Sequence, residues 1–142
     1  MAKTFYCDIV SAECQIYSGQ VEVLVASGES GELGVYPGHS PLLTRLIPGP
    51  IRILEPSGDV EIYYASGGFL EVQGDAVTVL ADTAIRADDI DEAAAESQRR
   101  LAADVLSKQQ GEIDYGRASA QLAEATAQLS TVRQLKARAL RG

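Results

Sequence analysis

The feature that most restricts the fold of this chain is a succession of short apolar segments, each closed by turn residues, between Thr4 and about Ala81. Intervals of roughly eight to twelve residues between turns are typical of β-sandwiches and β-barrels. Val21, Val23 and Val25 occupy alternate positions, which gives a strand one face that points inward. Seven of the eight aromatic side chains lie in this part of the chain. The sequence therefore predicts an N-terminal all-β sandwich or flattened barrel that holds the main core.

The character of the sequence changes near Ala87. Beyond this residue there is no proline and alanine is the commonest residue, a composition that favours helix. Gly111 is placed to stop a first helix and Asp114 to cap a second. Two helices joined by so short a loop are expected to lie antiparallel, as an αα-hairpin. We therefore predict an α+β protein with a sandwich domain at residues 1–87 and a helical hairpin at residues 88–142.

Sequence spacing also predicts the start and the faces of the hairpin. Asp89, with Glu92 three positions later, resembles a capping box, so the first helix is expected to begin there. An apolar stripe then recurs every three or four positions in each helix. The predicted stripes are Ile90, Ala94, Ser97, Leu101 and Val105 in the first helix, and Ala118, Leu122, Ala125, Leu129, Val132 and Leu135 in the second.

These stripes are narrow and rich in alanine. At about 25 cal/mol per Å² of buried apolar surface, they stabilise the hairpin only modestly. A weakly held element of this kind can be shifted between two arrangements by a partner or ligand that prefers one of them. The composition therefore predicts a hairpin that changes its position.

Charge and composition argue against several classes of partner. A net charge of -8 repels nucleic acid and anionic lipid, so we expect no nucleic-acid binding. The acidity belongs to residues 1–87, where eleven Asp or Glu stand against four Lys or Arg. No window approaches the length of a membrane-spanning helix and no charged leader precedes an apolar run, so the protein is expected in the cytoplasm. Cys7 and Cys14 are not spaced as a metal site, and we expect reduced thiols and no metal.

A rigid corner occupies Gly31–Leu43, which reads Gly-Glu-Leu-Gly-Val-Tyr-Pro-Gly-His-Ser-Pro-Leu-Leu. Its glycines and prolines force at least two sharp turns while leaving leucines and a valine for the core. This string resembles the glycine-proline-glycine-histidine segment of the epsilon subunit of bacterial F-type ATP synthase. Two further strings, Ser66–Val72 and Thr78–Arg86, resemble the same family in the same order. The resemblance runs from about Thr4 to about Leu140.

The resemblance implies a small rotor subunit without catalytic activity of its own. In that family the sandwich binds the gamma subunit and rests on the ring of membrane c subunits, which helps to couple proton flow to ATP synthesis. The hairpin of bacterial members folds down beside the sandwich or extends along gamma into the alpha/beta catalytic head, where it inhibits ATP hydrolysis. The implied location is the cytoplasmic face of the bacterial inner membrane, with membrane contact only through partner subunits. No cofactor is implied.

The resemblance also assigns roles to particular residues. The corner that contains Glu32 and His39 is expected to face the polar loops of the c ring. Arg133, Lys136 and Arg138 are expected to approach an acidic loop of the catalytic beta subunits when the hairpin extends. The residues themselves leave two explanations open, because cations near a helix C-terminus are favoured by the helix dipole without any partner.

Some members of the family bind ATP on the compact hairpin through a motif of Ile or Leu, Asp, two variable residues, Arg and Ala. Ile90 and Asp91 match this motif, but Ala94 stands where the arginine is expected. The exchange removes a cation that would pair with phosphate. We therefore expect weak or no ATP binding, with Arg99 and Arg100 as the residues that could compensate.

Two other classes of function stay open. The first is a small hydrolase that uses His39 and Ser40, but Pro41 lacks the amide and Leu42 replaces the glycine of a nucleophile elbow. A hydrogen-bonded turn histidine is therefore the favoured interpretation. The second alternative is a stand-alone ligand-binding sandwich that dimerises through its hairpin.

Overall fold

The computed structural model describes residues 3–107 and 112–141, and for residues 112–115 and 138–141 only the helical backbone is described. Short strands follow one another through the first 86 residues. They are β1 (Phe5–Ser11), β2 (Gln15–Val21), β3 (Val23–Gly28), β4 (Gly31–Val35), β5 (Leu42–Leu46), β6 (Gly49–Leu54), β7 (Val60–Ala65), β8 (Gly68–Gln73), β9 (Ala76–Ala81) and β10 (Ala84–Arg86).

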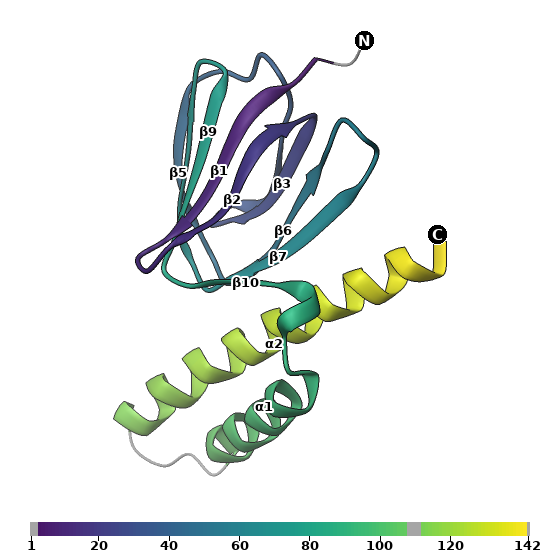
Figure 1. The fold of residues 1–142 in the computed structure, drawn as a ribbon. Coiled ribbons are helices and arrows are strands. Elements are labelled where there is room, and N and C mark those ends of the chain that lie inside the picture. The colour runs from purple at the N-terminus through teal and green to yellow at the C-terminus, as the bar shows by residue number, and fades with distance from the viewer. Residues whose placement is uncertain (1–2, 108–111, 142) are drawn as a thin grey trace.

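The strands form one hydrogen-bonded sheet that folds over on itself into two layers (Figure 1). Its order is β10-β7-β6-β3-β5-β8-β9-β1-β2, with β4 paired to β3. β1 and β9 run parallel, while the other ladders are antiparallel. β3 and β5 meet through the Gly28–Leu46 pair, where the sheet passes from one layer to the other. The predicted sandwich is confirmed.

Alternate side chains of the strands point between the layers and form the core, as period-two patterning requires. The largest buried members include Ile9, Leu24, Ile51, Ile53 and Leu70. Removing such side chains from water supplies most of the stability of a domain of this size.

Strand β7 differs from the others because both of its faces are buried. Tyr63 and Ala65 belong to the core between the layers, whereas Ile62 and Tyr64 point to the opposite face and are also buried. A helix covers that second face, since α2 (Glu112–Arg141) packs against β6 and β7. The helical hairpin therefore packs on the outer face of β7.

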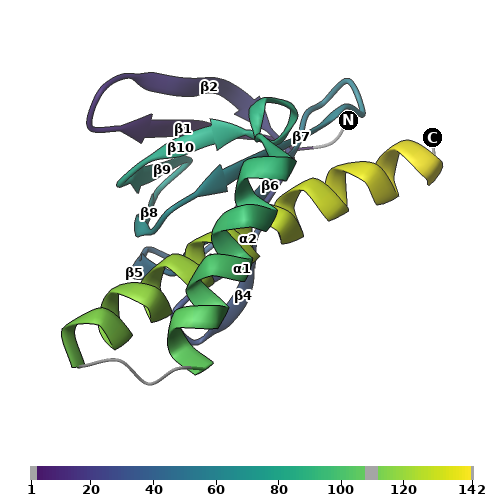
Figure 2. The ribbon, with the colours of Figure 1, turned by 90° about the horizontal axis from the view of Figure 1, so that it is seen from below.

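The hairpin follows β10 through a short 3₁₀ turn, η1 (Ala87–Asp89). α1 (Glu92–Ser107) leads away from the sandwich and α2 returns past it, so that α2 lies between α1 and the strands (Figures 1 and 2). The buried side chains of the two helices are all small, and among the described residues they are Ala95, Ala102, Ala118, Ala125, Ala127, Thr131 and Val132. The predicted two-helix hairpin is confirmed.

The predicted helix starts need correction. Asp89 belongs to η1, and the cap of α1 is Asp91, whose Oδ1 accepts a hydrogen bond of 3.0 Å from the N–H of Ala94. The helix begins later because Ile90, after η1, has an extended backbone conformation. α2 begins at Glu112, two residues before the predicted cap Asp114. The predicted stop at Gly111 lies outside the described residues.

The predicted apolar stripe of α1 was wrong by one residue. Ala95 and Ala102 are buried against α2, whereas Ala94, Ser97 and Leu101 are exposed. Alanines lie on both faces of α1, so periodicity alone could not identify the face that makes contact. The predicted stripe of α2 is confirmed. Its alanines and Val132 are buried, and its leucines are half-buried.

Candidate interaction surfaces

Glu32 lies at the end of β4 that follows the β3–β4 turn. The turn is closed by Gly31, whose φ of 127° suits glycine. Glu32 Oε1 lies 3.6 Å from Nη2 of Arg52 on β6, and both side chains are exposed. An exposed pair at this distance is weak and screened by salt. The carboxylate of Glu32 is therefore accessible to a partner.

His39 lies in the loop beyond the other end of β4. Its N–H donates a hydrogen bond of 3.2 Å to the carbonyl oxygen of Tyr36, which closes a turn that contains Gly38 at a φ of 86°. Three strand residues separate Glu32 from the end of β4, which corresponds to about 10 Å. The predicted corner therefore presents Glu32 and His39 as two separate points.

The ring of His39 does not pair with the hydroxyl of Ser40. Its Nδ1 lies 2.7 Å from the carbonyl oxygen of Ser40, so Nδ1 is the donor in this contact. A hydrolase needs the ring to accept a proton from the hydroxyl. The geometry is that of a turn histidine held by its own backbone.

The start of the hairpin engages its charged side chains internally. Asp91 caps α1. Arg99 and Arg100 both bind Glu96, with shortest distances of 2.6 Å and 3.2 Å. The hydrogen bond from Arg99 is the main cause that lowers the pKa of Glu96. The two arginines that could replace the missing ATP-binding cation are thus already paired with a carboxylate.

The cations of α2 differ in their partners. Lys136 Nζ lies 2.9 Å and 3.1 Å from the two carboxylate oxygens of Glu92 on α1. Arg133 is exposed on the same helix. Arg138 lies in α2, but its side chain is outside the described residues. In this arrangement Lys136 joins the two helices.

Apolar side chains gather on the outer face of β5, β8 and β9, a surface we call the β5–β8–β9 face. Leu43, Phe69 and Leu80 are its exposed hydrophobic members, with exposures of 68%, 44% and 49%. Phe69 pairs across the strands with Arg45 on one side and Leu80 on the other. The guanidinium of Arg45 lies 5.7 Å from the centre of the Phe69 ring, a cation–π contact.

Sequence reasoning assigned no role to the β5–β8–β9 face. The signal was present, because Phe69 and Leu70 are adjacent apolar residues in β8, as are Val79 and Leu80 in β9. A strand with one solvent face alternates apolar and polar residues. Two apolar neighbours therefore place one apolar side chain on each face of β8 and of β9.

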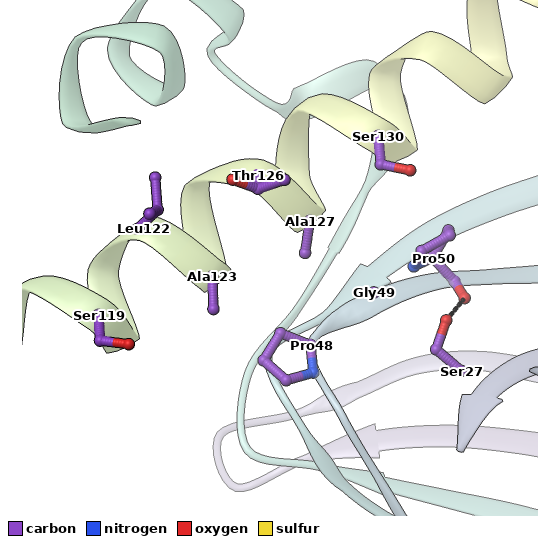
Figure 3. A pocket seen from close by; sticks show the side chains of 10 residues that line it. All are labelled: Ser27, Pro48, Gly49, Pro50, Ser119, Leu122, Ala123, Thr126, Ala127 and Ser130. Carbon is purple, nitrogen blue, oxygen red and sulfur yellow. Dashed lines mark hydrogen bonds between the residues drawn. The ribbon is translucent and has the colours of Figure 1, made fainter. Parts of the chain in front are cut away.

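A groove of about 510 Å³ lies where α2 crosses the sandwich. Figure 3 shows Ala123 and Ala127 of α2 pointing toward Pro48 and the strands, with the hydroxyl of Ser27 bonded to the carbonyl oxygen of Pro50 at 3.4 Å. Small residues line the helix side of the groove. At this groove α2 and the sandwich are therefore not closely packed.

Tyr64 is covered by the hairpin. The side chain is 1% exposed, and its hydroxyl finds no hydrogen-bond partner among the described residues. Burial raises the pKa of Tyr64, and the negative charge of Glu124 on α2 raises it further. The phenol is therefore neutral and lies under the helix.

In the part of the chain that the structure describes, the His, Cys, Asp and Glu side chains form no cluster that could hold a metal ion. Within the same residues, no helix has the length and apolar character needed to cross a bilayer. The surfaces that stand out are apolar or charged faces suited to protein partners.

These features define a class of protein: a β-sandwich that carries a two-helix hairpin and presents faces for docking. Family models agree with this class. The model described as ATP synthase, Delta/Epsilon chain, beta-sandwich domain matches residues 4–87, and the one described as ATP synthase, Delta/Epsilon chain, long alpha-helix domain matches residues 88–133. The chain belongs to the ATP synthase delta/epsilon chain family, and its resemblance to the bacterial epsilon subunit is confirmed.

Curated relatives support this assignment along nearly the whole chain. The ATP synthase epsilon chain of Chromohalobacter salexigens is 57% identical over 133 residues, which cover 94% of each chain. The ATP synthase epsilon chain of Teredinibacter turnerae is 54% identical over 140 residues, which cover 98% of this chain and 99% of the relative.

Solved structures share the fold. A chain of the Euglena gracilis mitochondrial ATP synthase aligns with a TM-score of 0.74 and 21% identity, covering 96% of this chain and 81% of that one. A chain of the Tetrahymena thermophila mitochondrial ATP synthase aligns with a TM-score of 0.63 and 11% identity, covering 92% of this chain and 97% of that one. At these identities the likeness concerns the fold alone.

Proposed function

We propose that this chain is a non-catalytic rotor subunit in the central stalk of a bacterial F-type ATP synthase. In this role it couples proton translocation through the c ring to ATP synthesis, and its hairpin inhibits ATP hydrolysis. The observation that carries the proposal is the 57% identity, over 94% of the chain, to a relative named ATP synthase epsilon chain. The proposed location is the cytoplasmic face of the inner membrane, with contact to the membrane only through partner subunits.

The two parts of the chain have separate tasks in this proposal. Residues 1–87 form the domain that binds the gamma subunit and the c ring, and residues 88–142 form the regulatory domain. Support comes from the contrast in packing, because the sandwich has a large core whereas α2 meets it through small side chains. A domain with its own core can keep its position while a weakly packed helix pair moves.

The β5–β8–β9 face is our candidate for the gamma-binding surface. Leu43, Phe69 and Leu80 supply apolar contact area, and Arg45 supplies a charged group at its edge. An apolar centre with a polar rim is typical of a stable protein interface. The hairpin packs on β6 and β7 and not on these strands. The gamma subunit could therefore stay bound to the β5–β8–β9 face while the hairpin moves.

Glu32 and His39 are our candidates for contact with the c ring. Both belong to the rigid β3–β4–β5 corner, and neither side chain is tightly engaged with the rest of the protein. Preformed loops bind with little loss of conformational entropy. Their separation along β4 implies two contact points on the ring.

Arg133, Lys136 and Arg138 are our candidates for docking on an acidic surface of the alpha/beta catalytic head. Positive charge at the end of an otherwise acidic chain steers that end toward acidic partners. Lys136 must first leave Glu92, because one ammonium group bound to a carboxylate in the hairpin is not free for another.

We further propose that this hairpin binds ATP weakly or not at all, and that the protein uses no cofactor or metal. Ala94 replaces the phosphate-pairing arginine of the family motif next to Ile90 and Asp91. Arg99 and Arg100 offer little compensation while Glu96 holds both. An ATP phosphate would have to compete with this carboxylate for the guanidinium groups.

Affinity capture tests the assignment to the ATP synthase. The full chain, tagged at its N-terminus, is expressed in its own bacterium and isolated from detergent-solubilised membranes. We expect the gamma, c, alpha and beta subunits to be recovered with it. Recovery of this chain alone or as a dimer would instead favour the stand-alone sandwich.

A further inference from the structure

The surface that holds α2 on the sandwich is built around a side chain that is ill suited to burial. On the outer face of β7, Ile62 and Tyr64 are 5% and 1% exposed, and they do not belong to the core between the layers. Both lose water when α2 packs on β6 and β7. The two residues therefore belong to the contact between hairpin and sandwich.

The hydroxyl of Tyr64 is buried in this contact without a hydrogen-bond partner among the described residues. The negative charge of Glu124, an exposed residue of α2, raises the pKa of Tyr64, but Glu124 makes no hydrogen bond with the phenol. A buried hydroxyl without a partner opposes the packing that buries it, because detachment returns it to water.

The rest of the contact offers no polar compensation. Among the described residues, α2 and the strands are joined by packing and by no hydrogen bond or ion pair. The open groove beside Ala123 and Ala127 shows that packing at this contact is incomplete. Two buried side-chain atoms lack a hydrogen-bond partner among the described residues, the Tyr64 hydroxyl and Oε1 of Gln134 on α2, and of these the Tyr64 hydroxyl belongs to the strand on which α2 packs.

We infer that Tyr64 is a built-in release element, whose unpaired hydroxyl weakens the docking of the hairpin on the sandwich and so sets how often the hairpin detaches. The inference rests on the proposed function in one respect, namely that detachment matters for inhibition. Replacing Tyr64 by phenylalanine keeps the ring and removes the hydroxyl. The docked form should then gain roughly tenfold over the detached form.

Thiol labelling of the full chain measures this equilibrium. Ala127→Cys places a thiol on the side of α2 that faces the groove, where Ala127 is 8% exposed. Its rate of alkylation is proportional to the detached fraction when docking is fast. Cys7, buried in the core, reports opening of the sandwich in the same sample, and Cys14, which is exposed, reacts at once.

Tyr64→Phe is expected to slow alkylation of the introduced thiol about tenfold, while the protection of Cys7 shows that the sandwich is folded. Tyr63→Phe is the matched control, because Tyr63 is the next residue of β7 and faces the core. This control should change the rate less than twofold. An unchanged or faster rate in Tyr64→Phe would overturn the inference, as would equal slowing in both variants.

A second readout separates this inference from the proposed function. In membranes with the assembled ATP synthase, Tyr64→Phe should raise ATP hydrolysis because the docked hairpin is favoured. Slower labelling without a rise in hydrolysis would uphold the role of Tyr64 in docking and contradict the inhibitory role of the hairpin.

Discussion

Lys136 of α2 and Glu92 of α1 form an ion pair across the hairpin, with Nζ 2.9 Å and 3.1 Å from the two carboxylate oxygens. The residues are 44 positions apart in the chain, and they join the first turn of α1 to the C-terminal part of α2. The pair closes the end of the hairpin that lies away from its loop. Lys136, which we propose docks on the catalytic head, is therefore paired with Glu92 while the hairpin is compact.

Breaking this pair should lower the free energy of unfolding of the hairpin slightly and make it depend less on salt concentration. Side-chain exposures of 63% and 51% mean that solvent screens the attraction. A double-mutant cycle with Glu92→Gln and Lys136→Gln should give a coupling energy of about 0.2–1 kcal/mol at low ionic strength, and less at high ionic strength. The measurement is urea unfolding followed by helical circular dichroism.

Arg133→Gln combined with Glu92→Gln is the matched control, since Arg133 is exposed on the same helix and is not the partner of Glu92. Its coupling energy should be near zero. A control coupling as large as that of the Lys136 cycle would contradict a specific pair.

A charge placed on the β5–β8–β9 face should weaken binding to gamma while the sandwich stays folded. Leu80 is 49% exposed, so Leu80→Glu buries no charge in the free protein. In a complex the carboxylate would be buried next to Phe69, with a loss in affinity of roughly 30-fold or more. Calorimetry with isolated gamma measures the change.

Tyr36→Glu serves as the control for this face. Tyr36 is 60% exposed and lies between β4 and β5, outside the β5–β8–β9 face. Its substitution should leave the affinity for gamma unchanged. Equal weakening by both variants would mean that the effect is one of net charge.

Much of the fold could be predicted from the sequence because it follows from local periodicity. Turn residues at regular spacing gave the strands, and the loss of proline after Ala87 gave the helices. The face of α1 could not be predicted, since Ala94 and Ala95 are equally suited to burial and only the position of α2 decides between them. The pairing of β1 with β9 depends on contacts distant in the chain, which no local pattern reveals.

The candidate site residues were found through family strings and not through their contacts. Sequence spacing gave no sign that Lys136 pairs with Glu92, or that Glu96 takes both Arg99 and Arg100. The unpaired hydroxyl of Tyr64 was also hidden, because its burial depends on a helix about 60 residues later in the chain. Long-range packing fixes these relationships.

ATP should bind the isolated chain only weakly or not at all. Phosphate recognition needs a free cation, and Ala94 supplies none while Glu96 occupies Arg99 and Arg100. Calorimetric titration with ATP should show no binding in the millimolar range. Glu96→Gln frees both arginines and is the variant in which ATP binding would first emerge. Tight binding by the wild-type chain that Asp91→Ala abolishes would contradict the proposal.

Raising the pH above about 9 should destabilise the sandwich through Cys7. Burial, assisted by the charge of Asp8, raises the pKa of the Cys7 thiol from 9.0 to about 12. Between these values the unfolded thiol loses its proton and the folded thiol keeps it, so the unfolded state binds fewer protons and stability falls as pH rises. The contribution of Cys7 is complete below pH 9 and is lost toward pH 12.

Urea unfolding between about pH 9 and 10 measures this effect, before the tyrosines add to it. The free energy of unfolding should fall about 1 kcal/mol per pH unit more steeply in the wild type than in Cys7→Ala. Cys14→Ala, at an exposed thiol, is the control and should keep the wild-type slope. Equal slopes for all three proteins would show that Cys7 ionises as readily folded as unfolded.

Removal of the hairpin tests most directly the claim that a fixed sandwich carries a movable inhibitor. The chain is truncated after Ala87, and ATP hydrolysis and ATP-driven proton pumping are measured in membranes that contain the assembled enzyme. We predict that hydrolysis rises several-fold while proton pumping survives. Unchanged hydrolysis, or loss of enzyme assembly, would contradict the account and make the hairpin a structural part.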